Sequence, residues 1–520
     1  MKKSLSLVLV MLMILGMCVS ALAEEPVSFS VTFLKNDWHG NPNNMEIMQK
    51  LEEEANVDVD WQIYSNATWS EKKNLIINSG ELPDVFYMNA VNATDVAKYG
   101  PQGMFLELTY LIDQYCPNLK AVMESNPTFK ALCTNPDDGK IYSISRAVER
   151  EANTLAGQMY IYKPWLDKLN LEIPTDYESF YQVLKAFKEQ DPNGNGQADE
   201  LPFAFSNMSF DYGFGNLFGM FGYGYNLDYG LSCDGITVVG DEAVFVPRTE
   251  NYKEAIAYFN RMFTEGLFSA EDYATQDSKL LNSKLHSKEV TVGCFIAFDA
   301  NIVVPAERLD DYVRMEPMAG PRSDRVWMQT GNPNNMGGTQ FVMTYKAKGK
   351  EEAIMRWLDA HFEKTNSIEL FLGSIGTNLE YDENGMLVYI PTPEGQSYSE
   401  FRYANCPVHV PCAISADQWN KDVQIMDEDA ARWVYMEEVL KPYLTQRALY
   451  QYVNNEDSKY LTSHGKDIMD YVRTTEARWM TAGGVEEEWD EYLERLDAMG
   501  IDEYVQVKQG ILERFQNAGK

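Results

Sequence analysis

The sequence predicts an α/β protein built from at least two domains. The chain has 520 residues, of which 45% are apolar, and this is enough for two or three separate hydrophobic cores. Strand and helix signals alternate over residues 27–88, and a similar alternation returns over residues 160–205. Such alternation is typical of α/β folds, in which helices cover a mostly parallel sheet.

The N-terminus carries the features of a secretory signal. Lys2 and Lys3 precede an apolar run over residues 5–17, and Ala21-Leu22-Ala23 provides a small-x-small cleavage site. The run is too short to count as a membrane span of the mature chain. We therefore expect residues 1–23 to be a signal peptide and the protein to be exported, to the extracellular face of the cytoplasmic membrane or to the periplasm.

The first part of the mature chain is predicted to form a parallel sheet. Residues 27–33 alternate apolar and polar side chains, which indicates a half-buried strand. A helix over residues 45–55, a strand over 57–61, a helix that begins near Thr68 and a strand over 85–88 follow. Strands separated by helices in this order pair in parallel.

Parallel sheets bind their ligands beyond the carboxyl ends of the strands. This rule selects two places in the predicted sheet. One is the loop after the first strand, which carries Trp38 and His39, and the other is the turn at Asn89. We therefore expect these three residues to face a ligand.

Residues 175–205 predict a helix, a polar loop and a strand. Thr175 and Glu178 are spaced as a capping box, and an apolar stripe follows at helical spacing. The stripe consists of Phe180, Val183, Leu184 and Phe187. Apolar residues 203–205 follow Pro202 and indicate the strand.

The polar loop DPNGNGQADE resembles the first part of an EF-hand calcium loop, because oxygen-bearing residues alternate around a glycine turn. Pro202 stands where an EF-hand has its bidentate glutamate, so a helix-loop-strand site fits better. The simpler alternative is a polar turn without a metal. Six hard oxygen ligands would suit Ca²⁺: Asp191, Asn193, Asn195, the Gln197 carbonyl, Asp199 and Glu200.

Several phrases resemble one subgroup of the extracellular solute-binding proteins of ABC transporters, the group that includes alginate-oligosaccharide-binding proteins. They are WLDKLNLEIPTDYESFYQVLKAFKEQDPNGNG with ADELPF, SGELPDVF, and the hairpin phrase DDGKIYSIS. The resemblance implies a structural calcium held by the six residues above. It also implies two α/β lobes joined by a hinge, which close around an oligosaccharide and deliver it to a membrane permease.

The resemblance implies interleaved lobes of a periplasmic-binding-protein-like fold. We expect residues 24–150 and about 300–350 in the N-terminal lobe, and residues 151–299 with about 351–520 mainly in the C-terminal lobe and a helical extension. Members of this group are often lipoproteins, and Cys18 stands at the position of such a lipid-bearing cysteine. Met17 precedes it where a small residue is expected, so cleavage after Ala23 is favoured over lipidation. We expect a monomer.

Aromatic residues in irregular segments are further candidates for a sugar site, because sugar rings stack on aromatic rings. The glycine-rich segment 209–226 lacks a phosphate-binding motif and predicts a flexible, aromatic-lined wall, although its rings could equally pack in a loop core. The candidates in irregular segments are Tyr212, Tyr225, Trp327, Arg402 and Trp419.

The net charge of −34 argues against binding nucleic acid or an anionic membrane surface. No GxSxG or HExxH motif is present, and 5 histidines leave little material for histidine-based catalysis. Two alternatives to an oligosaccharide receptor stay open: a secreted glycan-active hydrolase or lyase, and a receptor for a peptide or other small solute. Among the cysteines, Cys406 and Cys412 either close a small loop or stay free.

Overall fold

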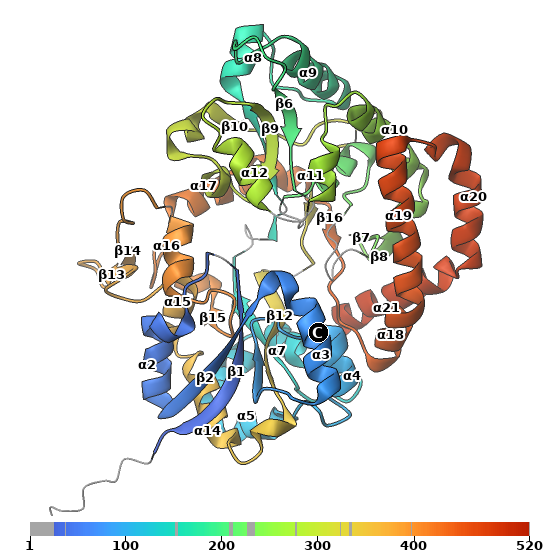
Figure 1. The fold of residues 1–520 in the computed structure, drawn as a ribbon. Helices are drawn as coiled ribbons and strands as arrows, with labels where there is room; N and C mark the ends of the chain where they lie inside the picture. The colour runs from blue at the N-terminus through green and yellow to red at the C-terminus, as the bar shows by residue number, and fades with distance from the viewer. Residues whose placement is uncertain are drawn as a thin grey trace, which may run out of the picture.

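The computed structural model describes residues 25–36, 38–150, 154–155, 157–206, 212–225, 234–275, 278–322, 324–331, 335–396 and 398–518. Two lobes lie one above the other, with helices around the sheet of each (Figure 1). The expected signal peptide, Cys18 and Cys233 fall outside the described residues. No helix among the described residues is both long enough and apolar enough to cross a membrane.

The first lobe is built on a six-stranded sheet in the order β15-β4-β12-β3-β1-β2. Every strand is parallel to the others except β12, which runs antiparallel to β3 and β4. The carboxyl ends of β1, β3 and β4 therefore share one edge, and this edge faces the second lobe (Figure 1). The strands are β1 (Val27–Lys35), β2 (Val57–Ser65), β3 (Val85–Tyr87), β4 (Ile144–Val148), β12 (Met336–Met343) and β15 (Ala413–Ile414).

Helices cover this sheet because their apolar faces share its core. The Trp357 side chain, fully buried, packs edge-on against Phe29 of β1 and Trp61 of β2. The predicted start of the second helix is confirmed, although Thr68 makes no capping hydrogen bond. The helices are α2 (Glu46–Ala55), α3 (Trp69–Ser79), α4 (Ala93–Tyr99), α5 (Thr109–Tyr115), α6 (Pro117–Ser125), α7 (Pro127–Cys133), α14 (Glu351–Ala360), α15 (Lys364–Leu372) and α16 (Tyr398–Asn405).

The second lobe contains a four-stranded sheet in the order β10-β5-β9-β6, in which β6 and β9 are parallel and β5 is antiparallel to both β9 and β10. Its strands are β5 (Gln158–Tyr162), β6 (Leu201–Ala204), β9 (Val292–Ala297) and β10 (Tyr312–Arg314). Its helices are α8 (Lys163–Leu169), α9 (Tyr177–Glu189), α10 (Glu250–Thr264), α11 (Ala270–Ala274), α12 (Ser278–Leu285), α13 (Ala300–Val303) and α17 (Asp427–Tyr435).

Helix α9 confirms the predicted apolar stripe, whose members are all buried in the core of the second lobe. Its cap differs from the prediction by one residue. Asp176 accepts a hydrogen bond from the Ser179 backbone at 2.8 Å, and the Asp176 backbone donates one to the Ser179 hydroxyl. Aspartate is a strong N-cap residue, so it takes this role from Thr175.

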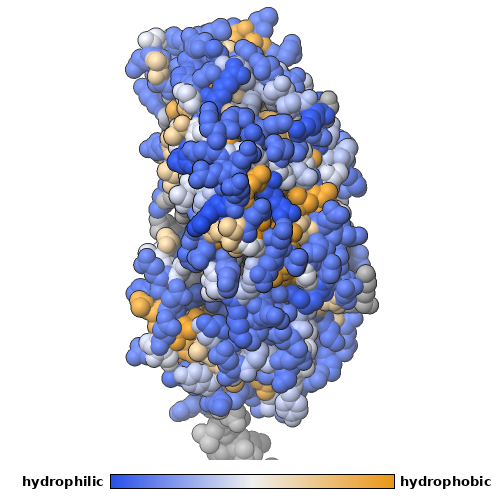
Figure 2. Space-filling model, turned by 90° about the vertical axis from the view of Figure 1, so that its right-hand side faces the viewer, coloured by the Kyte–Doolittle hydropathy of each residue, from blue (hydrophilic) through white to orange (hydrophobic). Residues whose placement is uncertain are grey.

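A third sheet and the last helices form an arm beside both lobes (Figure 1). Helices α19 and α20 pack on α10 of the second lobe, whereas α18 packs on α4 and α21 contacts α7 in the first. Figure 2 shows this side of the molecule as mostly hydrophilic, with scattered apolar patches. The elements are β7 (Ile236–Val239), β8 (Glu242–Phe245), β11 (Met328–Gln329), β16 (Gln446–Ala448), α18 (Asn455–Tyr460), α19 (Lys466–Ala482), α20 (Val485–Ala498) and α21 (Ile501–Ala518).

Two of the expected lobe boundaries are wrong. Residues 351–423 fall in the range expected mainly in the second lobe, about 351–520, but α14, α15, β15 and Val423 pack in the core of the first. Residues 300–318 fall in the range expected in the first lobe, about 300–350, but Val303, Tyr312 and Met315 pack in the second. An amphipathic helix can cover either sheet, so the sequence pattern alone does not show which lobe receives it. A small hairpin of β13 (Leu379–Tyr381) and β14 (Leu387–Tyr389) extends from the first lobe. Cys406 and Cys412 are buried, and neither forms a disulfide with another described cysteine.

Candidate functional site

The loop after β1 is held against α16 at the edge of the first sheet. The Gly40 backbone donates a hydrogen bond to the Tyr403 carbonyl at 2.9 Å. A Cβ atom at Gly40 would lie 2.0 Å from the Ala404 carbonyl oxygen, so only glycine permits this approach. The contact leaves the Trp38 side chain 42% exposed, and its ring is thus available to a ligand.

His39 is a buried hydrogen-bond donor in the same loop. Its ring is 5% exposed, and burial, together with the charge of Lys35, lowers its pKa to about 4. The ring is therefore neutral at pH 7. Its Nδ1 accepts a hydrogen bond from the Asn36 backbone at 3.1 Å, so the proton lies on Nε2. That N–H has no hydrogen-bond partner in the part of the chain that the structure describes.

A hydrogen-bonded chain lies beside His39. The Tyr403 ring packs edge-on against His39 with centroids 4.9 Å apart, and its hydroxyl lies 3.3 Å from His409 Nε2. Arg146 Nη1 lies 3.0 Å from His409 Nδ1. Burial and the Arg146 charge hold the pKa of His409 well below its ordinary value. A neutral His409 accepts from Arg146 and donates to Tyr403, because a guanidinium only donates.

No sequence pattern pointed to Arg146, Tyr403 or His409. They come from β4, α16 and the segment before β15, and 263 positions separate Arg146 from His409. The pairing of β15 with β4 helps to bring these segments together.

Two further predicted residues join the same edge of the sheet. The Arg402 guanidinium lies over the Tyr403 ring, 5.2 Å from its centroid. Trp419 donates from Nε1 to the Glu149 carbonyl at 3.1 Å, and the Arg150 guanidinium covers its ring at 4.6 Å.

Asn89 lies just beyond β3, as the strand-end rule predicts. It is exposed, adopts a left-handed conformation with φ of 58°, and accepts from the Thr339 backbone at 2.7 Å.

Two of the residues predicted to line the sugar site are buried in the structure instead. Tyr225 is 1% exposed and packs between Phe218 and Tyr252, and Trp327 is 4% exposed in the same core. The expected flexible wall instead contains a buried helical turn at Phe214–Phe221, whose aromatic side chains fill the second lobe. Tyr212 is half-buried beside β9, and residues 207–211 and 226–233 fall outside the described ranges.

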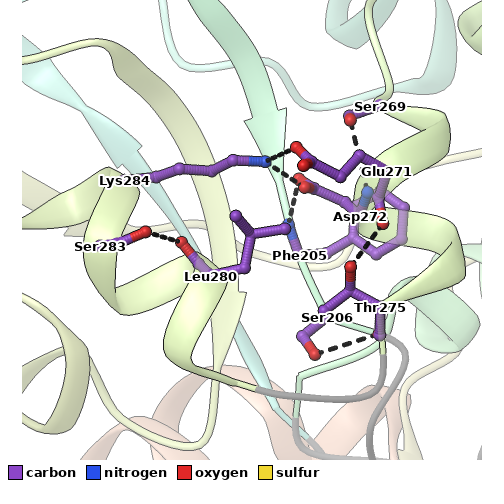
Figure 3. A network of polar contacts seen from close by, with 9 residues as sticks. All are labelled: Phe205, Ser206, Ser269, Glu271, Asp272, Thr275, Leu280, Ser283 and Lys284. Carbon is purple, nitrogen blue, oxygen red and sulfur yellow. Dashed lines mark hydrogen bonds and ion pairs between the residues drawn. The ribbon is translucent and has the colours of Figure 1, made fainter.

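The edge of the second lobe that faces the first lobe is organised around a buried carboxylate. Asp272, 1% exposed, forms an ion pair with Lys284 and accepts from the Phe205 backbone at 3.3 Å (Figure 3). Burial raises the pKa of Asp272, and the Lys284 contact opposes this change. These bonds join α11 and α12 to the carboxyl end of β6. A second ion pair, between Arg314 and Asp299 at 2.9 Å, lies beyond β9.

The predicted calcium loop is closely hydrogen-bonded. The Asp191 carboxylate accepts from the backbones of Gly194, Asn195 and Gly196 at 3.0–3.1 Å. The side-chain amides of Asn193 and Asn195 donate to the two Asp199 carboxylate oxygens at 2.9 and 3.0 Å. Lys168 of α8 donates to the Pro192 carbonyl at 2.7 Å and ties the loop to the lobe.

Glu200 supplies the observation that fits a cation. Its side chain is 8% exposed and Oε1 has no hydrogen-bond partner among the described residues. Burial raises its pKa, and the neighbouring Asp199 and Asp191 charges raise it further. A bound cation would relieve all three effects. In the described part of the chain, however, no three acidic, histidine or cysteine side chains already converge as a metal site, so the calcium set stays a prediction.

Glu289, which the sequence interpretation missed, accepts from the Asn195 side chain at 3.0 Å. It precedes β9, and the sequence pattern does not place it near the loop.

Residues 43–359 match the family described as bacterial extracellular solute-binding protein, and the chain belongs to that family. The predicted family is therefore confirmed, as is the two-lobed α/β fold.

Over 492 residues the chain is 30% identical to the fructooligosaccharide ABC transporter substrate-binding protein FusA of Streptococcus pneumoniae, covering 92% of this chain and 88% of that protein. The structure of FusA in complex with kestose superposes with a TM-score of 0.84 at 28% identity, covering 94% of this chain and 99% of that one. An extracellular solute-binding protein of Bifidobacterium longum subsp. infantis gives 0.78 at 26%, with 94% and 98% covered.

Proposed function

We propose that this protein captures an oligosaccharide between its two lobes and delivers it to the permease of an ABC transporter. The observation that carries the proposal is the exposed indole of Trp38 at the edge that faces the second lobe. Sugar rings offer apolar faces that stack on aromatic rings. Behind Trp38 lies the buried Nε2–H of His39, which has no hydrogen-bond partner among the described residues and could donate to a sugar oxygen if the loop moves on binding.

The similarity to FusA supports a fructan as the first ligand to test. FusA matches over most of both chains, and its solved structures include complexes with kestose and with fructo-nystose. A ligand buried between lobes would bind Trp38 and His39 on one side, with Arg402, Trp419 and Asn89 along the same edge. Tyr212 is a candidate from the second lobe.

Isothermal titration calorimetry with kestose and longer fructooligosaccharides tests the proposal. We expect binding with a Kd of about 1 µM, or about −8 kcal/mol. Trp38→Ala is expected to weaken binding by about tenfold, since an aromatic stacking contact contributes about 0.5–1.5 kcal/mol beyond the area that it buries. Tyr110→Ala is the matched control, because Tyr110 is 68% exposed on α5, away from the edge.

Failure of fructans and of a panel of plant and microbial oligosaccharides to bind would overturn the sugar assignment. The same samples test the enzymatic alternative. Chromatography after overnight incubation is expected to return each sugar intact, and cleavage products would instead indicate a hydrolase or lyase.

We further infer that the mature protein is exported, monomeric and stabilised by one structural Ca²⁺. The proposed ligands are the side chains of Asp191, Asn193, Asn195, Asp199 and Glu200 with the Gln197 carbonyl. The buried Glu200 Oε1, which has no hydrogen-bond partner in the part of the chain that the structure describes, supports this proposal. A solved structure of an EF-hand mutant of FusA is consistent with such a site in that relative. The bound ion would neutralise the Asp191, Asp199 and Glu200 carboxylates, and the loop that holds it would join α9 to β6.

Metal removal provides the test of the calcium proposal. A ligand that binds only the native state stabilises it by about 4 kcal/mol at 1,000 times its Kd. Chelation is therefore expected to lower the melting temperature, and Asp191→Ala to abolish the difference between calcium and chelator. An Asp191→Ala protein that responds to calcium like the unaltered chain would contradict the proposal. Light scattering checks the monomer.

A further inference from the structure

The Asn195 side chain has a fixed orientation in the polar loop. Its Oδ1 accepts a hydrogen bond from the Gln197 backbone at 2.7 Å, and a backbone N–H can only donate. The amide nitrogen is therefore the other terminal atom. Nδ2 lies 3.0 Å from an Asp199 oxygen and 3.0 Å from Glu289 Oε2.

We infer that Glu289 is a positioning residue for the calcium site, which acts by holding the Asn195 amide with its oxygen toward the metal. The inference rests on the proposed calcium loop and extends it to a residue from another segment. Ca²⁺ binds the amide oxygen and not the NH₂ group. A carboxylate outside the ligand set can only accept, so it retains the NH₂ group and leaves Oδ1 for the ion.

The same loop contains an independent sign of a cation site. Glu200 is 8% exposed, and its Oε1 lacks any partner in the described ranges. It lies beside the Asp191 and Asp199 carboxylates, whose charges act on it. Asp199 now accepts from Asn193 and Asn195, and it can turn to a metal only if another acceptor keeps the Asn195 NH₂ group. Glu289 is that acceptor.

Glu289 also connects the loop to a second strand. It lies 94 positions from Asn195, in the segment between α12 and β9. The Leu201 backbone at the end of the loop donates to the Thr291 carbonyl at 2.7 Å, and Leu201 pairs with Val292. The proposed metal site lies between α9 and β6, and Glu289 connects it in addition to the segment that leads into β9.

Calcium titration of the metal-free mature chain by calorimetry tests the inference. Glu289→Ala is expected to weaken calcium binding by about tenfold, the lower end for the loss of a residue that orients a ligand. Glu189→Gln is the matched control, because it removes one exposed charge two residues before the loop. It should change the affinity by less than about twofold, since exposed charges are screened. Melting in chelator should be the same for all variants.

A second pair of variants separates orientation from charge. Asn195→Asp has two equivalent oxygens and needs no partner to select between them. In the Asn195→Asp background, Glu289→Ala should change the calcium affinity by less than about twofold, since only a screened charge effect is left. An equal loss in the unaltered and Asn195→Asp backgrounds, or a Glu289→Ala protein with the affinity of Glu189→Gln, would overturn the inference. An unaltered chain that binds no calcium would overturn both this inference and the calcium loop, whereas sugar binding is independent of either result.

Discussion

Acid should destabilise the first lobe through His361. This residue follows α14, is fully buried, and lies edge-on against Trp357 with ring centroids 4.5 Å apart. Its Nε2 lies 2.6 Å from the Tyr87 hydroxyl and its Nδ1 lies 2.8 Å from the Trp357 carbonyl. Nδ1 must donate to the carbonyl, so the neutral ring accepts from Tyr87. Protonation would remove that acceptor inside the core.

The magnitude follows from the pKa of His361, which burial lowers from 6.5 to about 4. The unfolded chain takes up this proton near pH 6.5, whereas the folded chain resists until about pH 4. Stability therefore falls as the pH falls through this interval. The full loss below pH 4 is about 3 kcal/mol, at about 1.36 kcal/mol for each unit of pKa. Between pH 7 and pH 5 the expected loss is about 2 kcal/mol.

Urea unfolding at pH 7 and pH 5, followed by tryptophan fluorescence, measures this loss. His361→Gln can donate to the Trp357 carbonyl and accept from Tyr87 without titrating. Its unfolding free energy should fall by about 2 kcal/mol less between the two pH values than that of the unaltered protein. His39 and His409 titrate equally in both proteins and cancel. His464→Gln, at an exposed position, should keep the original pH dependence. Parallel pH profiles for His361→Gln and the unaltered chain would refute the reasoning.

Two further predictions concern the strand-end loop and the C-terminal helix. Gly40→Ala should push the loop away from the Ala404 carbonyl and break the hydrogen bond to Tyr403, with a loss of about 1–3 kcal/mol of stability and weaker sugar binding. Calorimetry and thermal melting check this, and unchanged values for both would contradict the close approach. Lys508→Met should cost about 3–5 kcal/mol, because Lys508 and Asp234, 3% and 6% exposed, form an ion pair at 2.8 Å and the substitution removes the cationic partner of a buried carboxylate. Adding Asp234→Asn should restore part of the loss in urea unfolding, and a double variant no more stable than Lys508→Met would rule out the unpaired charge as the cause.

The local order of elements could be predicted from the sequence, because strands and helices leave periodic patterns that do not depend on distant residues. The alternation over residues 27–33 became β1, and the stripe from Phe180 to Phe187 became the buried face of α9. The family could be recognised from phrases of consecutive residues. In contrast, the lobe that receives α14 depends on Trp357 meeting Phe29, a contact between distant segments.

In the candidate site too, residues that follow from a local rule could be predicted, whereas residues that meet through contacts between distant segments could not. The strand-end rule placed Trp38, His39 and Asn89 correctly at the sheet edge, since it uses only the direction of the strands. It could not find Arg146, Tyr403 and His409, which meet only after three separate segments fold together. Tyr225 and Trp327 are predicted to bind the sugar but are buried in the core. A ring that packs in a core and a ring that binds a sugar have the same sequence signal.

The arm formed by the last helices has a consequence for ligand capture. The Phe515 side chain packs against both hydrophobic cores, and Tyr450 lies 4.8 Å from it, between the same two cores. The Arg514–Asp457 ion pair and the bond from the Asn455 backbone to Asp137 at 2.7 Å continue this connection. Wide separation of the lobes would break these contacts. The two lobes of the ligand-free protein should thus explore a narrow range of relative orientations. Closure around a sugar would then cost the lobes little orientational entropy.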